Sequence, residues 1–222
     1  MMVSNKNQLV QQILDNREAP GIIKELNSAL ETEMQKRQAF YDAMSTEELK
    51  TEFINGEVIV HSPVKKQHND ISFSLAMIFE IYADKYDLGY IGYEKIMISL
   101  TRNDYEPDVC FFKKEIAVSF TDTQSLFPAP SLAVEVLSKN TAGRDRGIKM
   151  QDYAAHGVEE YWIIDPRTKT VEQYFNEDGS FYLHKKSDEG MISCKAITNL
   201  TFQIVAIFDK KERRKFIAEL TK

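Results

Sequence analysis

Two acidic residues stand beside or inside apolar runs that are typical of buried strands. Asp108 precedes the apolar run of residues 109–112, and Glu135 is the single acid within residues 132–137. A lone carboxylate in an apolar strand costs several kcal/mol unless it is paired, protonated or bound to a metal ion. Two such strands in succession therefore indicate one shared site, and the chain must fold so that both carboxylates reach it.

The segment after Glu135 predicts how these strands are connected. Residues 143–157 are typical of a helix closed by glycine, and residues 160–165 are typical of a strand that ends at a proline turn. A strand, a helix and a strand in this order predict two parallel strands joined by a right-handed crossover. Lys149 and Tyr153 share one helix face, which can cover the strand that carries Glu135.

This topology can bring Asp108, Glu135 and Lys149 together. Two carboxylates are oxygen ligands for a hard divalent cation, and an ammonium group can position a nucleophile or neutralise a phosphate. A purely structural alternative is a buried ion network in which the two acids pair with Arg144 or Lys149. At this point the residues leave both interpretations open.

Several motifs in and around these strands resemble a known family. They are Pro107-Asp108, Glu135-Val136-Leu137-Ser138, Arg144-Asp145, Lys149, Tyr153, Gly157-Val158 and Glu160-Tyr161-Trp162-Ile163-Ile164-Asp165-Pro166, with Glu52-Phe53-Ile54-Asn55-Gly56-Glu57, His61-Ser62-Pro63 and His68 upstream. On these motifs the chain resembles the Uma-two-type putative restriction endonucleases, a bacterial group of the PD-(D/E)xK nuclease superfamily, over residues 46–208.

The resemblance implies both a fold and an activity. The expected fold class is α/β (α+β), with a restriction endonuclease-like core in which helices flank a mixed central β-sheet. The expected activity is hydrolysis of DNA phosphodiester bonds by a magnesium-dependent endonuclease, with Mn²⁺ as the other candidate ion. The acids and the lysine of the family pattern match Glu52, Asp108, Glu135 and Lys149, and the implied metal ligands are Asp108 and Glu135.

The sequence departs from the superfamily pattern at the lysine. Leu137 occupies the position, two residues after the second acid, where the superfamily usually has lysine, so the resemblance implies a lysine from the following helix. Lys139 is the competing candidate, but residues 138–141 are typical of a loop and differ from the family's Ser-Pro-Ser-Thr. A lysine on a packed helix is held closer to productive geometry than one on a loop, which favours Lys149.

The net charge of −6 argues mildly against a nucleic-acid partner, because DNA binding draws on clustered basic residues. The distribution of charge matters more than its sum. Lys139, Arg144 and Arg146 flank the expected site, and together with His68 they are the predicted contacts to double-stranded DNA. The second basic cluster, within residues 210–215, is predicted to be a solvated helix face.

Residues 1–44 lie outside the resemblance and are predicted to form a helical extension of a nuclease domain that spans residues 45–222. A stripe at intervals of three and four runs through residues 22–44 and consists of Ile23, Leu26, Leu30, Met34, Arg37 and Tyr41. This stripe can cap the core or pair with a second copy, and the pattern does not choose between them; a homodimer is the expected assembly. Ser45 is predicted to cap a new helix, with Glu48 three residues later.

The remaining elements follow from turn and periodicity signals. Asn55-Gly56 is a preferred dipeptide of the type I′ turn and predicts a hairpin over residues 52–60. The other predicted elements are helices at 7–14, within 63–86 and at 209–220, and strands at 90–100, 170–175 and 181–185. Cys110 and Cys194 are predicted to be reduced core residues. Because the sequence shows neither a signal-peptide pattern nor an apolar run of spanning length, a cytoplasmic location without membrane association is expected.

Two other functions are compatible with these features. A catalytically silent DNA-binding or assembly module would keep the fold without binding a metal ion. A metal-dependent hydrolase of small phosphate esters would suit the acidic net charge. Titration of Mg²⁺ or Mn²⁺ with and without duplex DNA separates the three functions.

Overall fold

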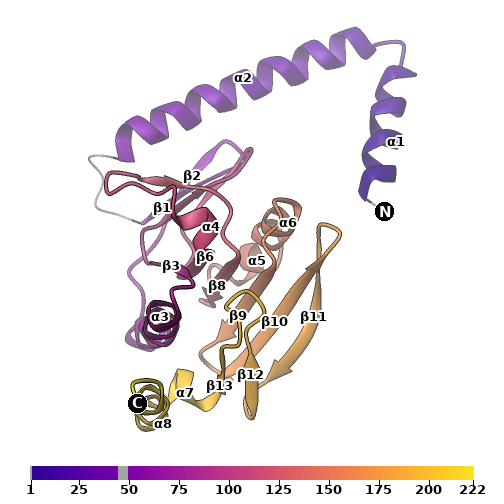
Figure 1. Cartoon of the computed structure of the whole chain (residues 1–222). Coiled ribbons are helices and arrows are strands. Elements are labelled where there is room, and N and C mark those ends of the chain that lie inside the picture. Colours follow the sequence, from indigo (N-terminus) through magenta and orange to yellow (C-terminus); the bar gives the residue numbers. More distant parts are fainter. Residues whose placement is uncertain (1, 45–49) are drawn as a thin grey trace.

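The computed structural model describes residues 2–44 and 50–222 and is organised around a six-stranded sheet (Figure 1). Its strands, in spatial order, are β11 (Ser180–Ser187), β10 (Thr170–Glu177), β9 (Glu160–Asp165), β8 (Leu132–Val136), β6 (Val109–Lys113) and β3 (Gly89–Tyr93). The β8 and β9 strands are parallel, as predicted, and the other neighbouring pairs are antiparallel. The two strands that follow or carry the buried acids, β6 and β8, are neighbours in the middle of this sheet.

The connection from β8 to β9 is helical, as predicted, but the predicted single helix is wrong. Two helices, α5 (Ala142–Asp145) and α6 (Ile148–Ala155), replace it. The break lies at Gly147, whose φ of −111° and ψ of −105° are not helical. A Cβ at this position would lie 2.8 Å from the carbonyl oxygen of Gly143, so the close approach requires glycine. Apolar periodicity could not reveal this break because it carries no information on backbone contacts.

A second sheet has five strands, which in spatial order are β2 (Glu57–Val60), β1 (Thr51–Ile54), β5 (Asp104–Tyr105), β4 (Met97–Ser99) and β7 (Leu126–Phe127). The predicted hairpin is confirmed, because Asn55 and Gly56 both have positive φ between β1 and β2. The single strand predicted over residues 90–100 is wrong. Glu94 takes a φ of +62° and turns the chain out of the six-stranded sheet, so β3 and β4 belong to different sheets.

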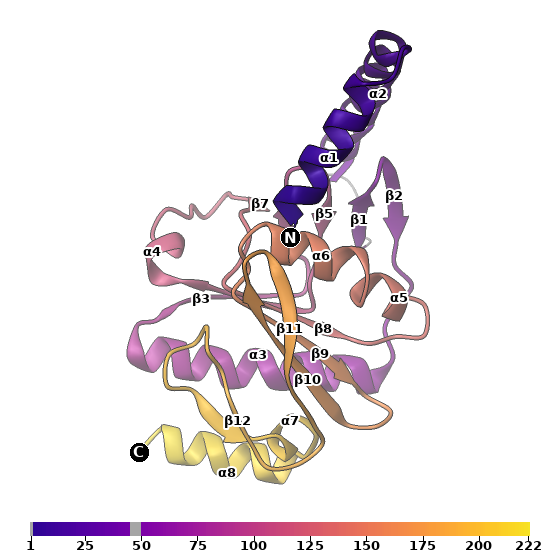
Figure 2. The same cartoon turned by 90° about the vertical axis from the view of Figure 1, so that its right-hand side faces the viewer.

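The two faces of the six-stranded sheet are covered by different elements. Helix α3 (Lys66–Tyr86) covers one face (Figure 2), and its buried side chains include the predicted stripe of Ile71, Leu75, Ile78 and Tyr82. The other face packs against the five-stranded sheet and α6. Alternate residues of β6 divide between the two faces, with Val109 and Phe111 toward α3 and Cys110 and Phe112 toward the second sheet.

The C-terminal part of the chain completes the α3 side. Its elements are β12 (Met191–Ser193), β13 (Thr201–Gln203), α7 (Val205–Phe208) and α8 (Lys210–Leu220), and a short helix α4 (Lys114–Ala117) follows β6. The predicted final helix is confirmed, and the carboxylate of Asp209 caps it by accepting hydrogen bonds from the backbone of Lys211 and Glu212. Cys110 and Cys194 are both buried and free, as predicted.

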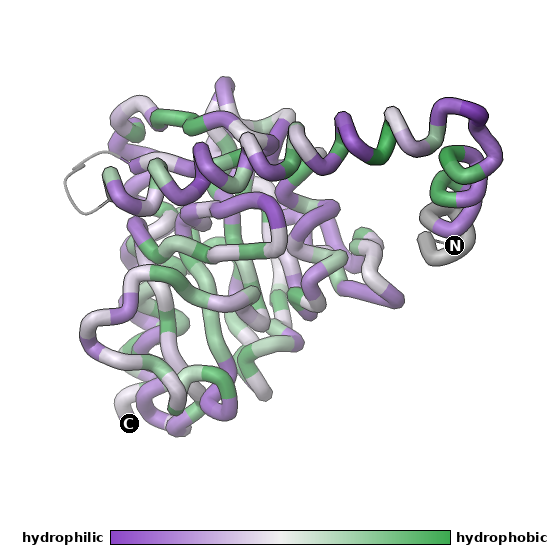
Figure 3. Tube along the Cα trace, turned by 90° about the horizontal axis from the view of Figure 1, so that it is seen from above, coloured by the Kyte–Doolittle hydropathy of each residue, from purple (hydrophilic) through white to green (hydrophobic). Residues whose placement is uncertain are grey.

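The N-terminal helices α1 (Met2–Leu14) and α2 (Ala19–Met44) form an arm that projects beyond the sheets (Figure 1). The C-terminal half of α2 packs on the second sheet, where Phe40 is 4% exposed and its ring centroid lies 5.8 Å from that of Phe53. Nearer its N-terminus, α2 carries an exposed apolar stripe of Ile23, Leu26, Leu30 and Met34. Apolar positions recur along this helix in Figure 3. The helix start predicted at Ser45 lies outside the described residues.

The fold class is therefore the predicted one, a mixed α/β arrangement in which helices flank mixed sheets. Within residues 2–44 and 50–222, no helix combines the length and the apolar character needed to cross a lipid bilayer.

Candidate active site

Four acidic side chains converge from different elements: Glu52 in β1, Asp108 just before β6, Glu135 in β8 and Asp145 at the end of α5. Strand pairing explains the approach of two of them. Because β6 and β8 pair Val109 with Val134, Asp108 lies beside the strand that carries Glu135. The backbone N–H of Val136 donates to Oδ2 of Asp108 at 2.7 Å and holds that carboxylate in place.

The ammonium group of Lys149 lies among three of these acids. Its Nζ is 2.6 Å from Oε1 of Glu52, 3.1 Å from Oε1 of Glu135 and 3.6 Å from Oδ1 of Asp145. Burial alone would lower the pKa of Lys149, but the surrounding carboxylates outweigh burial and raise the pKa well above its usual value. The side chain is therefore a fixed cation at neutral pH.

Glu52 is a buried, ionised carboxylate. Burial favours its neutral form, yet the charge of Lys149 and the hydrogen bond with His61 hold the pKa of Glu52 at about 2. Nε2 of His61 lies 2.9 Å from Oε2, and the backbone N–H of Glu106 donates to Oε1 at 3.1 Å. With Lys149 also on Oε1, both oxygens of Glu52 are engaged by the protein itself.

Asp108 is held by a second lysine and a histidine. Nζ of Lys50 lies 3.0 Å from Oδ1, and Nε2 of His68 lies 3.2 Å from Oδ2. Burial opposes ionisation here as well, but the charge of Lys50 and the hydrogen bond with His68 hold the pKa of Asp108 well below its usual value. Asp108 is thus ionised over the whole neutral range.

Glu135 is the least compensated of the acids. Burial raises the pKa of Glu135 well above its usual value; Lys149 opposes this shift, and the nearby charges of Asp145 and Asp108 add to it. Burial also raises the pKa of Asp145. The cluster therefore holds more carboxylates than lysines, and a divalent cation would neutralise the excess.

The donor set suits a hard cation that keeps part of its water. Within the described ranges, 2–44 and 50–222, no three His, Cys, Asp or Glu side chains are grouped as a complete metal site. Mg²⁺ commonly takes one or two protein carboxylates and completes its octahedron with water and phosphate oxygens. Asp108 and Glu135 border the same cleft and fit this requirement, for Mg²⁺ or for Mn²⁺, which prefers the same ligands.

A cleft of about 810 Å³ opens over these residues, which we call the active-site cleft. Its lining includes Lys50, His68, Asp108, Glu135, Asp145 and Lys149. Of the predicted DNA contacts, Lys139, Arg144 and His68 line this cleft. Arg146 is turned elsewhere, because its Nη2 lies 2.8 Å from Oε1 of Glu172 on β10. Glu52 is 0% exposed and lies beneath Lys149.

The sequence analysis assigned no role in the site to three contributors, namely Lys50, His61 and Asp145, although His61 and Asp145 belong to the motifs of the resemblance. Lys50 and Glu52 are two residues apart, the spacing that puts side chains on one side of a strand. Asp145 precedes Lys149 by four residues, an ion-pair spacing. The hairpin register places His61 beside Lys50, whose carbonyl accepts a hydrogen bond from the His61 backbone. These spacings can be read from the sequence. The same spacings are also found among charged side chains that are exposed to solvent, so they did not identify a site.

The chain is similar to several known proteins. A family model, Uma2, described as "Putative restriction endonuclease", matches residues 37–206. Two uncharacterized proteins of Synechocystis sp. are similar in sequence. One, sll1609, is 33% identical over 129 residues, which are 56% of this chain and 71% of that protein. The other, slr1290, is 27% identical over 164 residues, which are 72% of this chain and 83% of that protein.

A solved structure shares the fold. It is the crystal structure of a putative nuclease belonging to DUF820 from Anabaena variabilis, which is similar with a TM-score of 0.63 and 17% sequence identity. The match covers 73% of this chain and 91% of the Anabaena protein. At this identity the likeness concerns the arrangement of helices and strands.

Proposed function

Because the chain belongs to the Uma2 family of putative restriction endonucleases, we propose that it is a metal-dependent endonuclease that hydrolyses phosphodiester bonds of double-stranded DNA. The observation that carries this proposal is the buried ammonium of Lys149, which lies 2.6 Å from Glu52 and 3.1 Å from Glu135 at the active-site cleft. A fixed cation beside a carboxylate that borders a cleft, here Glu135, is an arrangement that can stabilise the charge that develops in phosphoryl chemistry.

Asp108 and Glu135 are the proposed metal ligands. When bound there, Mg²⁺ or Mn²⁺ would supply Lewis-acid polarisation of the scissile phosphate and would lower the pKa of a water molecule. Asp108 is already ionised, since Lys50 and His68 hold its pKa low. Burial raises the pKa of Glu135, and added positive charge at this site would favour its ionised form.

Lys149 is the proposed catalytic lysine. Hydrolysis adds a water oxygen to phosphorus, breaks one phosphorus–oxygen ester bond and delivers a proton to the leaving oxygen. Negative charge grows on the phosphoryl oxygens as this proceeds, and the ammonium of Lys149 stabilises it without having to reorganise. Glu52 positions Lys149, because its two oxygens are occupied by Lys149, His61 and the backbone of Glu106.

The proposed DNA contacts border the same cleft. Lys139 is exposed and Arg144 is half-buried, and both line the cleft on the segment that follows β8. Their charges would contact phosphate oxygens and hold the duplex over Glu135 and Lys149. We assign no DNA contact to Arg146, because its guanidinium binds Glu172.

The test is single-turnover cleavage of duplex DNA with Mg²⁺, combined with calorimetric titration of Mg²⁺ and Mn²⁺ with and without the duplex. Cleavage that Glu135→Gln abolishes supports the proposal. A protein that binds duplex DNA but leaves it intact with either ion is the silent module. Hydrolysis of a small phosphate ester such as p-nitrophenyl phosphate, with duplex DNA left intact, indicates the small-ester hydrolase instead.

A further inference from the structure

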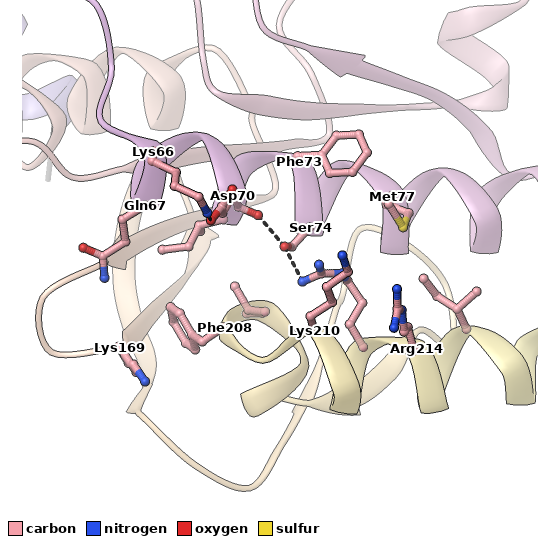
Figure 4. A pocket seen from close by; sticks show the side chains of 14 residues that line it. Lys66, Gln67, Asp70, Phe73, Ser74, Met77, Lys169, Phe208, Lys210 and Arg214 are labelled. Atoms are coloured by element: carbon pink, nitrogen blue, oxygen red, sulfur yellow. Dashed lines mark hydrogen bonds and ion pairs between the residues drawn. The ribbon is translucent and has the colours of Figure 1, made fainter.

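A second hollow, of about 700 Å³, lies between α3 and α8 (Figure 4), and we call it the basic groove. Its basic side chains are Lys66, Lys169, Lys210, Arg213 and Arg214. Asp70 is the one acid among the described residues that line it, so the basic groove has an excess of four positive charges. In a chain with a net charge of −6, this local concentration of positive charge indicates a surface for an anionic partner.

The basic side chains come from both walls of the groove. Lys66 on α3 forms an ion pair with Asp70, which already neutralises the acid. Lys210 and Arg214 extend from α8 toward α3 (Figure 4). The basic cluster within residues 210–215 was predicted to be a solvated helix face. Because α8 lies beside α3, three of the cluster's residues line the groove, whereas Lys211 and Lys215 do not.

The basic groove adjoins the active-site cleft. Gln67, in the first turn of α3, lines both hollows, and its side-chain amide donates a hydrogen bond to the carbonyl of Pro166. The turn between β9 and β10 also borders both, because Arg167 lines the cleft and Lys169 lines the groove. A ligand long enough to leave the cleft past Gln67 therefore meets the basic groove.

We propose that the basic groove binds the phosphate backbone of the DNA duplex beside the segment being cleaved. This inference rests on the proposed function. Between Lys66 and Met77 the groove follows α3 for about 16 Å at 1.5 Å per residue. At 3.4 Å per nucleotide step along one strand, this length corresponds to about five phosphates. Five basic side chains from three segments, in the lining of a groove of this length, suit a continuous polyanion better than a single phosphate.

Two double variants on α8 test whether DNA affinity depends on the position of the basic residues or only on the net charge of the protein. Lys210→Gln/Arg214→Gln removes two charges that line the groove. Lys211→Gln/Lys215→Gln removes two charges from the same helix at the same four-residue spacing, outside the groove lining. Lys169→Gln, on the turn between β9 and β10, tests the groove without changing α8. The melting temperature of each variant is compared with that of the wild type. If the Lys210→Gln/Arg214→Gln variant does not fold, the DNA affinity of Lys169→Gln tests the groove instead.

Binding of a fluorescein-labelled duplex of about 20 base pairs, roughly 68 Å long at 3.4 Å per step, is measured by anisotropy at several salt concentrations, with Ca²⁺ in place of Mg²⁺. For the groove pair we expect an affinity about thirtyfold lower at 0.15 M salt, with a salt slope lower by about two, as counterion release predicts for two phosphate contacts. For Lys169→Gln we expect an affinity about fivefold lower and a salt slope lower by about one, as for the loss of one phosphate contact. The Lys211→Gln/Lys215→Gln pair should stay within about twofold of the wild type, as expected for charges that make no phosphate contact.

Equal losses in the groove pair and the control pair, or no loss in either, would overturn the inference. Displacement of the duplex by millimolar inorganic phosphate, beyond the effect of chloride at equal ionic strength, would also overturn it by revealing a single-anion site. If the wild type cleaves duplex DNA while both pairs bind it equally, only the groove assignment fails. If the wild type neither binds nor cleaves duplex DNA, the proposed function fails and the inference falls with it.

Discussion

Nζ of Lys149 lies 2.6 Å from Oε1 of Glu52, and the two side chains are 2% and 0% exposed. The pair is therefore almost completely buried, and removal of one partner leaves the other charge poorly compensated. We expect Lys149→Met to lower the single-turnover rate of DNA cleavage on the order of a hundredfold or more, because the ammonium no longer stabilises the developing charge. We also expect it to destabilise the fold by about 3–5 kcal/mol.

The double variant Glu52→Gln/Lys149→Met separates these two effects. It should regain much of the lost stability without regaining activity, since the amide that replaces the Glu52 carboxylate carries no charge into the interior. Lys139→Met should keep its cleavage rate at saturating DNA, bind DNA more weakly and lower the salt slope by about one. Loss of turnover in Lys139→Met, with Lys149→Met active, would assign the catalytic lysine to the loop.

Glu135→Gln should make the metal-free protein more stable at neutral pH. Burial and the neighbouring acids raise the pKa of Glu135, so its ionised form is disfavoured in the folded state. A neutral isostere removes this penalty, while Lys149 keeps its contact with Glu52. Thermal unfolding in EDTA measures the stability, and calorimetry should show loss of Mg²⁺ binding. Undiminished metal binding would rule out Glu135 as a ligand.

Lys50→Met tests the second lysine. Nζ of Lys50 lies 3.0 Å from Oδ1 of Asp108, the carboxylate proposed to hold the metal ion. A bound cation would repel this ammonium, so its removal should raise the affinity for Mn²⁺ by about tenfold, equivalent to about 1.4 kcal/mol. Titration calorimetry gives the affinity, with Lys139→Met as the exposed-lysine control. Unchanged or weaker binding would show that Lys50 does not compete with the metal ion.

Glu106→Gln should change the pH dependence of the free energy of unfolding. Glu106 is 5% exposed, and burial raises its pKa to about 7. Because the folded state binds the proton more tightly than the unfolded state, this residue favours folding at low pH, and that contribution is lost as pH rises from about 4.5 to about 7. In EDTA, Glu106→Gln should be more stable than the wild type by on the order of 1–3 kcal/mol at pH 8 and nearly equal to it at pH 5. Equal melting temperatures at pH 8 would contradict this.

Truncation of the N-terminal arm tests the proposed homodimer. Removal of residues 1–30 deletes the exposed Ile23, Leu26 and Leu30 but keeps Arg37, whose guanidinium binds both carboxylate oxygens of Asp104 at 2.7 Å. We expect a folded monomer by light scattering and a dimer for the full chain, because the truncation deletes three of the four residues of the stripe that we propose as the contact between copies. Equal mass per particle would place the stripe outside any dimer contact. Removal of residues 1–44 should also lower the melting temperature, because it deletes Phe40 from its packing on Phe53.

Local sequence determined most of the elements and two features of the site. The Asn55-Gly56 turn, the stripe on α3 and the crossover from β8 to β9 depend on residues close together in the chain, so periodicity and turn chemistry predicted them. The buried acids were found for a similar reason, since a carboxylate in an apolar strand demands a partner wherever it occurs. The contact of Lys149 with Glu135 followed from the strand and helix that succeed each other.

Only the tertiary structure decided which residues complete the set of partners around the buried acids. Lys50 reaches Asp108 across 58 residues, because the strands that follow these two residues belong to different sheets. Away from the site, Arg37 of α2 reaches Asp104 across 67 residues. The division of β3 from β4 and the break at Gly147 depend on a backbone turn at Glu94 and a close approach to Gly143, neither of which leaves a hydrophobic pattern. Which charges are buried together depends on packing between segments that are far apart in the sequence. Local sequence patterns do not show these contacts.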